Sequence, residues 1–485
     1  MQKCDSPSFL EKNNIQINTK MTKKRRTKPI ISGGGFLEVL KVALPLILSN
    51  SCHAVNMFVD RLMLAQHSKE AVAAAFTGGL TNFTIACIFV GTIGYTGTFV
   101  AQYEGAHHRE RIGSTVWQGI WLSLIGGSFL FACIWLAPPL FRSFGHDPAV
   151  TEQEIDYFQI LCKGGFIFLL LGAVSSFWTG RGKTGFVLSV SALITLFNLP
   201  LNYIFIFGKL GLPEMGTAGA AWGTILADLI GLVIYFAVFF APSARKHFQT
   251  HRISWDFPLL KRMIRFGLPS GIHLALDLIA FNTFSLLLGC YGVAVHEASS
   301  ITFGINNIAF CPIMGIGMTA SILVGQAVGG EQIPLAKKAT RSCIILVVLY
   351  SLLMMLLFSV FQGVVLAPFT RTGDVNQLET LRISSYMLYF ISAYLIFDGF
   401  NVVYSNALRG AGDTKFPMWV MTGVGIVCFA LPCLLLYFSG FPWWSLWIVF
   451  DCEILLLGVI FTLRYRGEKW TKMRVIEVAA LPDEN

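Results

Sequence analysis

The stretch CIILVVLYSLLMMLLFSVFQGVVLA, residues 343–367, has no charged side chain and indicates the fold class of the chain. An α-helix rises about 1.5 Å per residue, so about 20 apolar residues are enough to cross the hydrocarbon core of a bilayer. Residues 222–241, WGTILADLIGLVIYFAVFFA, form a second run of this kind, which only Asp228 interrupts. Both stretches are therefore predicted to be membrane-spanning helices.

The composition of the whole chain agrees with a membrane protein. Of 485 residues, 54% are hydrophobic and only 13% are charged, and the mean hydropathy is +0.64. A soluble chain carries about 25% charged residues, so this chain cannot build a water-soluble surface. The eleven cysteines lie mostly inside apolar runs without a C-x-x-C pair, which indicates neither a disulfide framework nor a metal site.

Apolar runs separated by polar residues, glycine or proline predict an all-α polytopic protein with twelve transmembrane helices. The predicted spans are 36–60, 71–101, 114–138, 160–178, 185–207, 217–241, 259–289, 297–328, 341–367, 383–408, 416–438 and 443–463. An even number of spans places both termini on one side. That side carries 29 of the 36 lysine and arginine residues, so both termini are predicted to be cytoplasmic.

The spans divide six and six around the longest polar connection. We predict a basic N-terminal tail at 1–35, a six-helix lobe at 36–241, a cytoplasmic linker at 242–258, a second lobe at 259–465 and a C-terminal tail at 466–485.

The two halves share sequence at constant offsets. An offset of 224 relates five elements, which are Leu44-Pro45 and Leu268-Pro269, Gly91 and Gly315, Val100 and Val324, Gln102 and Gln326, and Gly105 and Gly329. An offset of 230 relates Gly180-x-Gly182-x-Thr184 to Gly410-x-Gly412-x-Thr414. Equal topology in both halves predicts a parallel repeat about an axis along the membrane normal, which is an architecture of transporters.

Motifs that indicate enzymes or nucleic-acid binding are incomplete. The sequence Arg181-Gly182-Lys183-Thr184 imitates a phosphate-binding loop, but Phe177 stands where its first glycine is required. His296-Glu297 begins a zinc-protease motif that lacks its second histidine. The basic cluster at 20–28, KMTKKRRTK, is interpreted as an anchor to anionic lipid rather than a nucleic-acid site. We therefore expect that the protein is not an enzyme and has no catalytic residue and no cofactor. We also expect that it does not bind nucleic acid.

Six acidic residues fall within predicted spans, where an unpaired carboxylate costs several kcal/mol. These candidates for cation binding are Asp60, Asp228, Asp277, Asp398, Asp451 and Glu453. Asp60 stands beside Arg61 near a span end, so an interfacial ion pair is the alternative to a cation site. Asp228, Asp451 and Glu453 could instead snorkel, hydrogen-bond between helices or lie near an interface.

Several longer motifs together resemble the multidrug and toxin extrusion (MATE) family, and in particular its NorM-like members. They are ALPLIL (43–48), FVDRLMLA (58–65), VAQYEGA (100–106), NLPLNYIFIFGKLGLPEMGTAGAAWGT (198–224), GLPSG (267–271), VGQAVG (324–329) and LRGAGDTKFP (408–417). The resemblance covers about 36–465. It implies a V-shaped pair of six-helix lobes around a cleft that exchanges organic cations for Na⁺ or H⁺.

The resemblance also assigns roles in the first lobe. Asp60 matches the cation-binding carboxylate of the family's FVD motif, Asn198 and Asn202 match its N-x-x-x-N/D pair, and Thr224 matches a nearby threonine. If the coupling ion is Na⁺, the resemblance makes Asp60, Asn198 and Asn202 its ligands.

In the second lobe, Asp277 stands where NorM-type members usually carry Glu, and Asp398 matches an acid of the same group. Glu297 stands where Gln is common, so the identity of the coupling ion stays open. Pro45 and Pro269 lie inside spans, where each removes a backbone hydrogen bond. We expect them to permit helix bending during transport, and a purely structural kink is the alternative.

Together these features predict an antiporter in a plasma membrane, the inner membrane of a bacterium, which works as a monomer. It is expected to export small, cationic, amphipathic molecules in exchange for Na⁺ or H⁺. A flippase for lipid-linked precursors is the alternative within the same superfamily. The predicted spans hold few Lys or Arg residues and several acids, which favours cationic substrates.

Overall fold

The structure is a computed structural model and describes residues 34–369 and 375–477. The basic cluster at 20–28, nearly all of the predicted tail 1–35 and the end of the predicted tail 466–485 lie outside the described residues. The predictions for these segments therefore stay predictions.

The described part of the chain is α-helical and contains no strand. Twelve of its helical segments are long and apolar enough to cross a membrane, as the sequence predicted. In the first half the helices are α2 (Phe36–His67), α3 (Lys69–Gly94), α4 (Thr96–Gly105), α5 (Arg109–Ala132), α6 (Ala137–Arg142), α7 (Pro148–Thr179), α8 (Thr184–Ile206) and α9 (Gly216–Phe239).

In the second half the spans run from α11 to α18. The helices are α11 (Phe257–Gly289), α12 (Val293–Gly329), α13 (Ile333–Val360), α14 (Gln362–Leu366), α15 (Val375–Ala411), α16 (Lys415–Val424), α17 (Leu431–Phe438) and α18 (Trp444–Arg466). A π-helical turn, Gly425–Ala430, joins α16 to α17. The short helix α10 (Pro242–Phe248) lies within the predicted linker.

Most helices are longer than the apolar runs that predicted them. The span expected at 160–178 begins twelve residues earlier, at Pro148, where the side chain of Asp147 accepts a hydrogen bond from the backbone N–H of Ala149 at 2.8 Å. A capping aspartate followed by proline is a start signal that hydropathy does not register. In the other direction, the span expected at 341–367 ends at Val360, and α14 follows as a separate helix.

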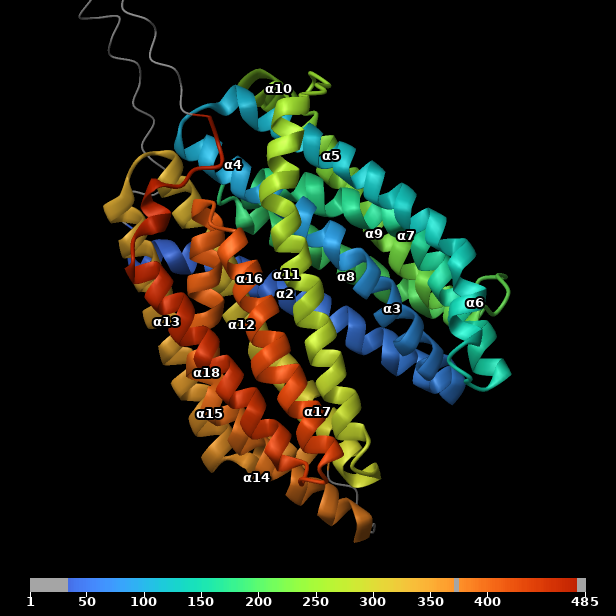
Figure 1. Cartoon of the computed structure of the whole chain (residues 1–485). Coiled ribbons are helices and arrows are strands. Elements are labelled where there is room, and N and C mark those ends of the chain that lie inside the picture. The colour runs from blue at the N-terminus through green and yellow to red at the C-terminus, as the bar shows by residue number, and fades with distance from the viewer. Residues whose placement is uncertain (1–33, 370–374, 478–485) are drawn as a thin grey trace, which may run out of the picture. The chain divides into compact units, whose positions relative to one another are not determined.

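Figure 1 shows the helices of the first half, coloured blue to green, and those of the second half, coloured yellow-green to red. The most extensive contacts between the halves are those of α3 with α11, α2 with α12, and α4 with α12. Glycines permit this close packing. A Cβ on Gly91 would collide with the backbone of Gly271, and one on Gly105 would collide with the carbonyl group of Gln326.

Two hydrogen bonds between the halves follow the internal repeat. The side-chain Nε2 of Gln102 donates to the carbonyl oxygen of Gly410 at 2.9 Å. In the same way, Nε2 of Gln326 donates to the carbonyl oxygen of Gly180 at 2.8 Å. The offsets of 224 and 230 residues relate these two bonds to each other. Each half therefore gives one buried glutamine to a glycine carbonyl of the other half.

Candidate functional site

Three helices of the first half bring together the residues that the sequence singled out there. Asn198 and Asn202 lie one turn apart on α8, Asp60 lies on α2 and Thr224 on α9, and α8 packs against both other helices. Nδ2 of Asn202 donates hydrogen bonds to Oδ1 of Asp60 and, at 3.2 Å, to Oδ1 of Asn198. Nδ2 of Asn198 donates to Oγ1 of Thr224 at 3.4 Å.

Small residues on α9 make this arrangement possible. A Cβ on Gly223 would collide with Oδ1 of Asn202, and one on Gly219 would lie 2.6 Å from the carbonyl group of Phe205. Because neither glycine has a side chain, α9 approaches α8 closely and the amide of Asn202 fits between them. The run GTAGAAWGT, residues 216–224, is therefore a packing surface for the asparagine pair.

Asp60 is paired with an amide and not with its neighbour in sequence. The guanidinium of Arg61 faces the ring of Phe76, with its Cζ atom 5.4 Å from the ring centroid. Among the described residues no ion pair joins Asp60 to Arg61. The interfacial ion pair that sequence position alone suggested is therefore not formed.

The side chains of this group could hold either a proton or a Na⁺ ion. Asn202 is fully buried, and its Oδ1 has no hydrogen-bond partner among the residues described. In the observed orientation, the amide donates to Asp60 and suits an ionised carboxylate. Turning the amide over would present Oδ1 to Asp60, which suits a protonated carboxyl group or a cation between the two oxygens. Na⁺ is a hard cation, and the oxygens of Asp60, Asn198, Asn202 and Thr224 are of the type that such cations accept.

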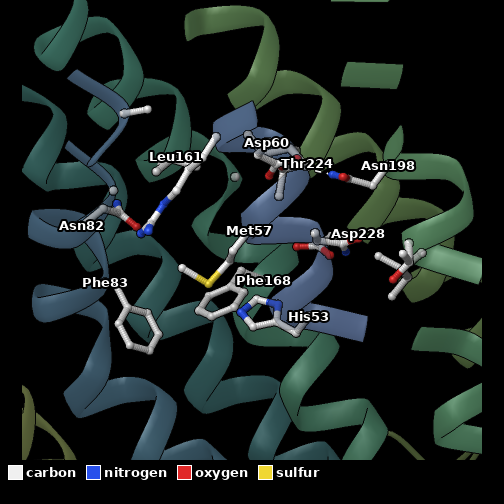
Figure 2. A pocket seen from close by; sticks show the side chains of 18 of the residues that line it. His53, Met57, Asp60, Asn82, Phe83, Leu161, Phe168, Asn198, Thr224 and Asp228 are labelled. Atoms are coloured by element: carbon white, nitrogen blue, oxygen red, sulfur yellow. Dashed lines mark hydrogen bonds between the residues drawn. The ribbon is translucent and has the colours of Figure 1, made fainter. Parts of the chain in front are cut away.

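A cavity of about 400 Å³ lies against this group, between α2, α3, α7, α8 and α9. Its walls include Met57, Phe83 and Phe168, together with Asp60 and Asp228. In Figure 2, Asp60, Thr224 and Asn198 lie together, and Asp228 lies beside them. An apolar cavity with a few convergent polar groups has the composition and size of a small-molecule site.

Sequence reasoning left Asp228 open and did not single out His53, which also lines the cavity. For Asp228 a signal was available, since it follows Thr224 by four residues and so lies on the same face of α9. His53 precedes Asp60 by seven residues, or two turns of α2, but this spacing carries no chemical signal of its own.

The acids predicted in the second half do not join this group. Asp277, on α11, is about half exposed, and its Oδ2 lies 3.9 Å from Nδ1 of His273. Asp398, on α15, is buried and accepts a hydrogen bond from Nδ2 of Asn401 at 3.4 Å. In the described part of the chain no hydrogen bond links Asp277 to Asp398.

The two remaining intramembrane acids lie on α18. Glu453 is buried, and Oδ1 of Asp451 is buried without a hydrogen-bond partner among the described residues. Neither residue lines the cavity of the first half.

The predicted helix-bending prolines both lie inside continuous helices. Pro45 lies in α2, the helix that carries Asp60, and Pro269 lies in α11, the helix that carries Asp277. Pro200 in α8 and Pro312 in α12 are further prolines inside spans, which sequence analysis did not single out. The proposed bending motion stays a prediction.

Curated relatives resemble this chain over most of its length. A protein described as a probable multidrug resistance protein NorM from Mesorhizobium japonicum is 24% identical over 432 residues, which cover 88% of this chain and 92% of the relative. A protein with the same description from Photorhabdus laumondii is 26% identical over 446 residues, which cover 89% of this chain and 96% of the relative.

Solved structures share the fold. A MATE protein in the straight conformation matches with a TM-score of 0.82 at 20% sequence identity, over 93% of this chain and all of that chain. An outward-facing multidrug resistance MATE family transporter of the MOP superfamily matches with a TM-score of 0.82 at 19% identity and the same coverage. The sequence pattern of the family described as MatE matches residues 45–204 and 269–434. This chain therefore belongs to the MatE family, as its resemblance to multidrug and toxin extrusion proteins indicated.

Proposed function

We propose that this protein exports small organic cations across the plasma membrane by antiport with Na⁺ or H⁺. The observation that carries the proposal is the cavity in the first half, where Asp60 and Asp228 face a largely apolar and aromatic wall within membrane-spanning helices. A flat, amphipathic cation offers the complementary surface, because its charge faces the carboxylates and its rings face Phe83, Phe168 and Met57.

The charge of the cavity favours exchange. The lining side chains that carry charge near neutral pH are Asp60, Asp228, Arg61 and, when protonated, His53. With both carboxylates ionised and His53 neutral, their net charge is that of one anion, which a single monovalent cation balances. A coupling ion and a monovalent organic cation each satisfy this requirement, so binding of one opposes binding of the other. Reciprocity then makes the substrate displace the ion, which is antiport.

The geometry of the transporter in its membrane is part of the same proposal. We place it in the inner membrane of a bacterium as a monomer, with both termini in the cytoplasm and no cofactor besides the coupling ion. Asp277 and Asp398 form a second candidate group for the ion in the second half, and bending at Pro45 and Pro269 would help to move substrate outward.

Efflux from proteoliposomes tests the proposal. A panel of fluorescent organic cations that includes ethidium is loaded, and Na⁺ and pH gradients are imposed separately on wild type and Asp60→Asn. We expect one gradient to accelerate efflux in the wild type and to have no effect in the variant. Absence of gradient-driven flux for every cation in the panel would contradict the proposal and favour the flippase of lipid-linked precursors.

A further inference from the structure

We propose that Asp228 anchors the N–H-bearing ammonium group of the substrate, while Asp60 holds the coupling ion. This inference rests on the proposed function and assigns different ligands to the two carboxylates of one cavity. It names the substrate class as protonated primary, secondary or tertiary amines, rather than organic cations in general.

The two carboxylates differ in their hydrogen bonds. Asp60 accepts a hydrogen bond from Asn202, which Asn198 and Thr224 support in turn. Asp228 lines the same cavity one helical turn after Thr224, and no described side chain or backbone group donates a hydrogen bond to it. A carboxylate within a span requires a donor or a counter-charge. A ligand in the cavity can supply both to Asp228.

The basic groups of the cavity do not fill this role. The guanidinium of Arg61 faces the ring of Phe76 and forms no described ion pair with either carboxylate. His53 lines the cavity from α2 and likewise forms no hydrogen bond or ion pair with Asp228 among the described residues. The carboxylate of Asp228 is therefore available to a ligand in the cavity, whose walls also include Met57 and Phe168.

A ligand that satisfies Asp228 must donate a hydrogen bond as well as carry charge. An ammonium group with an N–H bond does both, whereas a quaternary ammonium group offers charge alone. Charge-assisted hydrogen bonds are roughly twice as strong as neutral ones. Wild-type protein should therefore bind a tertiary amine more tightly than the same skeleton after N-methylation.

Binding measurements on purified protein in nanodiscs test this assignment. The probes are a fluorescent tertiary amine and its N-methylated quaternary form, and the variants are Asp228→Asn and Asp60→Asn, with Glu379→Gln at an exposed position of α15 as a control acid outside the cavity. We expect Asp228→Asn to weaken binding of the tertiary amine by roughly tenfold or more and to abolish its advantage over the quaternary form. Asp60→Asn should retain that advantage but lose displacement of the amine by the coupling ion.

Wild-type affinity and amine preference in folded Asp228→Asn, while the wild type transports, would overturn this assignment and leave the proposed function intact. Loss of both binding and ion displacement in Asp60→Asn alone would also overturn it. Absence of gradient-driven transport in the wild type would instead overturn the proposed function.

A second inference rests on a different part of the molecule. We infer that residues 473–477, here called the C-terminal strap, hold the two halves of the protein closed at one end. This end is formed by the last turns of α4, α12 and α15 and by the segment that follows α18, and it is the end predicted to be cytoplasmic.

The middle of the strap, Val475 and Ile476, is buried between the two halves. The backbone N–H of Val475 donates to Oε1 of Gln102 at 3.0 Å, and this glutamine also bonds to Gly410 across the halves. Val475 and Ile476 are buried in one hydrophobic cluster with Phe99 of the first half and Met263 of the second. The strap therefore fills the seam between the halves.

Ion pairs hold the strap in the same position. The carboxylate of Glu477 pairs with Arg262 of the second half and, at 3.5 Å, with Arg111 of the first half. Arg474 pairs with Glu331, which follows α12, at 2.9 Å. Before the strap, the buried Trp470 donates from Nε1 to the carbonyl oxygen of Tyr465 at 2.9 Å and ties the segment to α18.

The strap breaks the symmetry of the repeat. Gln102 and Gln326 are equivalent by the 224-residue offset and make equivalent bonds to Gly410 and Gly180. Only Gln102 also accepts a hydrogen bond from the strap. The strap therefore adds a contact that has no counterpart at Gln326, and parting of the halves at this end must release the strap from Gln102 and Arg111.

Distances between spin labels test the role of the strap. Labels at Lys246→Cys on α10 and Lys338→Cys on α13, both exposed, report on separation of the halves in a background without native cysteines. The test variants are Glu477→Lys and a chain ending at Lys472. The matched control is Glu468→Lys, because Glu468 pairs with Lys337 within the second half.

We expect both test variants to raise the population of long label distances several-fold, while Glu468→Lys leaves the distribution unchanged. Thermal unfolding in detergent checks that each variant is folded. Distributions equal to that of the wild type in both folded test variants would overturn the inference, as would an equal shift in Glu468→Lys.

Discussion

At the scale of single residues, the site depends on the amide of Asn202, which is fully buried between Asp60 and Gly223. Its Nδ2 donates hydrogen bonds to both Asp60 and Asn198, and its Oδ1 has no hydrogen-bond partner in the part of the chain that is described. A buried polar atom without a partner is costly, so release of this oxygen toward a cation would be favourable. Binding of the coupling ion should therefore depend on the side chain of Asn202.

Two replacements of Asn202, by Asp and by Leu, should change the affinity for the coupling ion in opposite directions. Asn202→Asp adds a second carboxylate beside Asp60 and should lower the ion concentration that gives half-maximal efflux. Asn202→Leu removes the amide and should raise that concentration or abolish coupling. Efflux measured over a series of Na⁺ concentrations and pH values checks both changes, and the same half-maximal concentration in both variants would contradict this role.

Gly223 should tolerate no side chain. In Gly223→Ala, the new Cβ collides with Oδ1 of Asn202, so coupling should be lost and the free energy of unfolding should fall by about 1–3 kcal/mol. The matched control is Gly172→Ala on α7, where a Cβ would meet nothing within 4 Å. Thermal unfolding and efflux are measured for both variants. Equal behaviour of the two would show that the packing argument is wrong.

At the scale of elements, helix ends show where hydropathy is an incomplete guide. The apolar pattern finds each span but stops where polar residues begin, whereas the backbone continues its hydrogen bonds up to a cap. The helix α7 illustrates the difference, since it extends back to Pro148 because Asp147 caps it.

The cap of α7 gives a prediction about stability. Asp147→Ala should lower the free energy of unfolding by about 1 kcal/mol, because it removes the acceptor for the N–H of Ala149. Asp156→Ala, at an exposed position within the same helix, serves as the control and should have a smaller effect. Thermal unfolding in detergent measures both, and a larger loss in Asp156→Ala would contradict the capping role.

At the scale of the whole molecule, the sequence predicted the architecture better than the site. Twelve spans and the repeat follow from local composition and from constant offsets such as that between Gln102 and Gln326, and both were confirmed. The grouping of Asp60 with Asn198 and Asn202 was expected only from family resemblance. The contact of Val475 with Gln102 joins residues that are 373 positions apart in sequence. No periodicity in the C-terminal tail predicts this contact.

The repeat also predicts unequal effects of equivalent mutations. Gln102→Leu removes the hydrogen bonds to the carbonyl oxygens of Gly410 and Ala411, and Gln326→Leu removes the one to Gly180. Both variants should therefore increase the population of long distances between labels at positions 246 and 338. Gln102→Leu should have the larger effect, because it also removes the acceptor for Val475. A larger effect of Gln326→Leu would contradict the asymmetry.

The transport that we propose is an obligatory exchange between an organic cation and a coupling ion through a cavity that contains Asp60. It is tested most directly by measuring the reverse flux, in which an imposed gradient of organic cation drives the ion. Proteoliposomes that enclose a Na⁺-sensitive or pH-sensitive dye receive the cation on one side, with no ion gradient at the start. We expect ion movement against the direction of the cation in wild type and none in Asp60→Asn, whereas cation flux without ion movement in the wild type would show that the exchange is not obligatory.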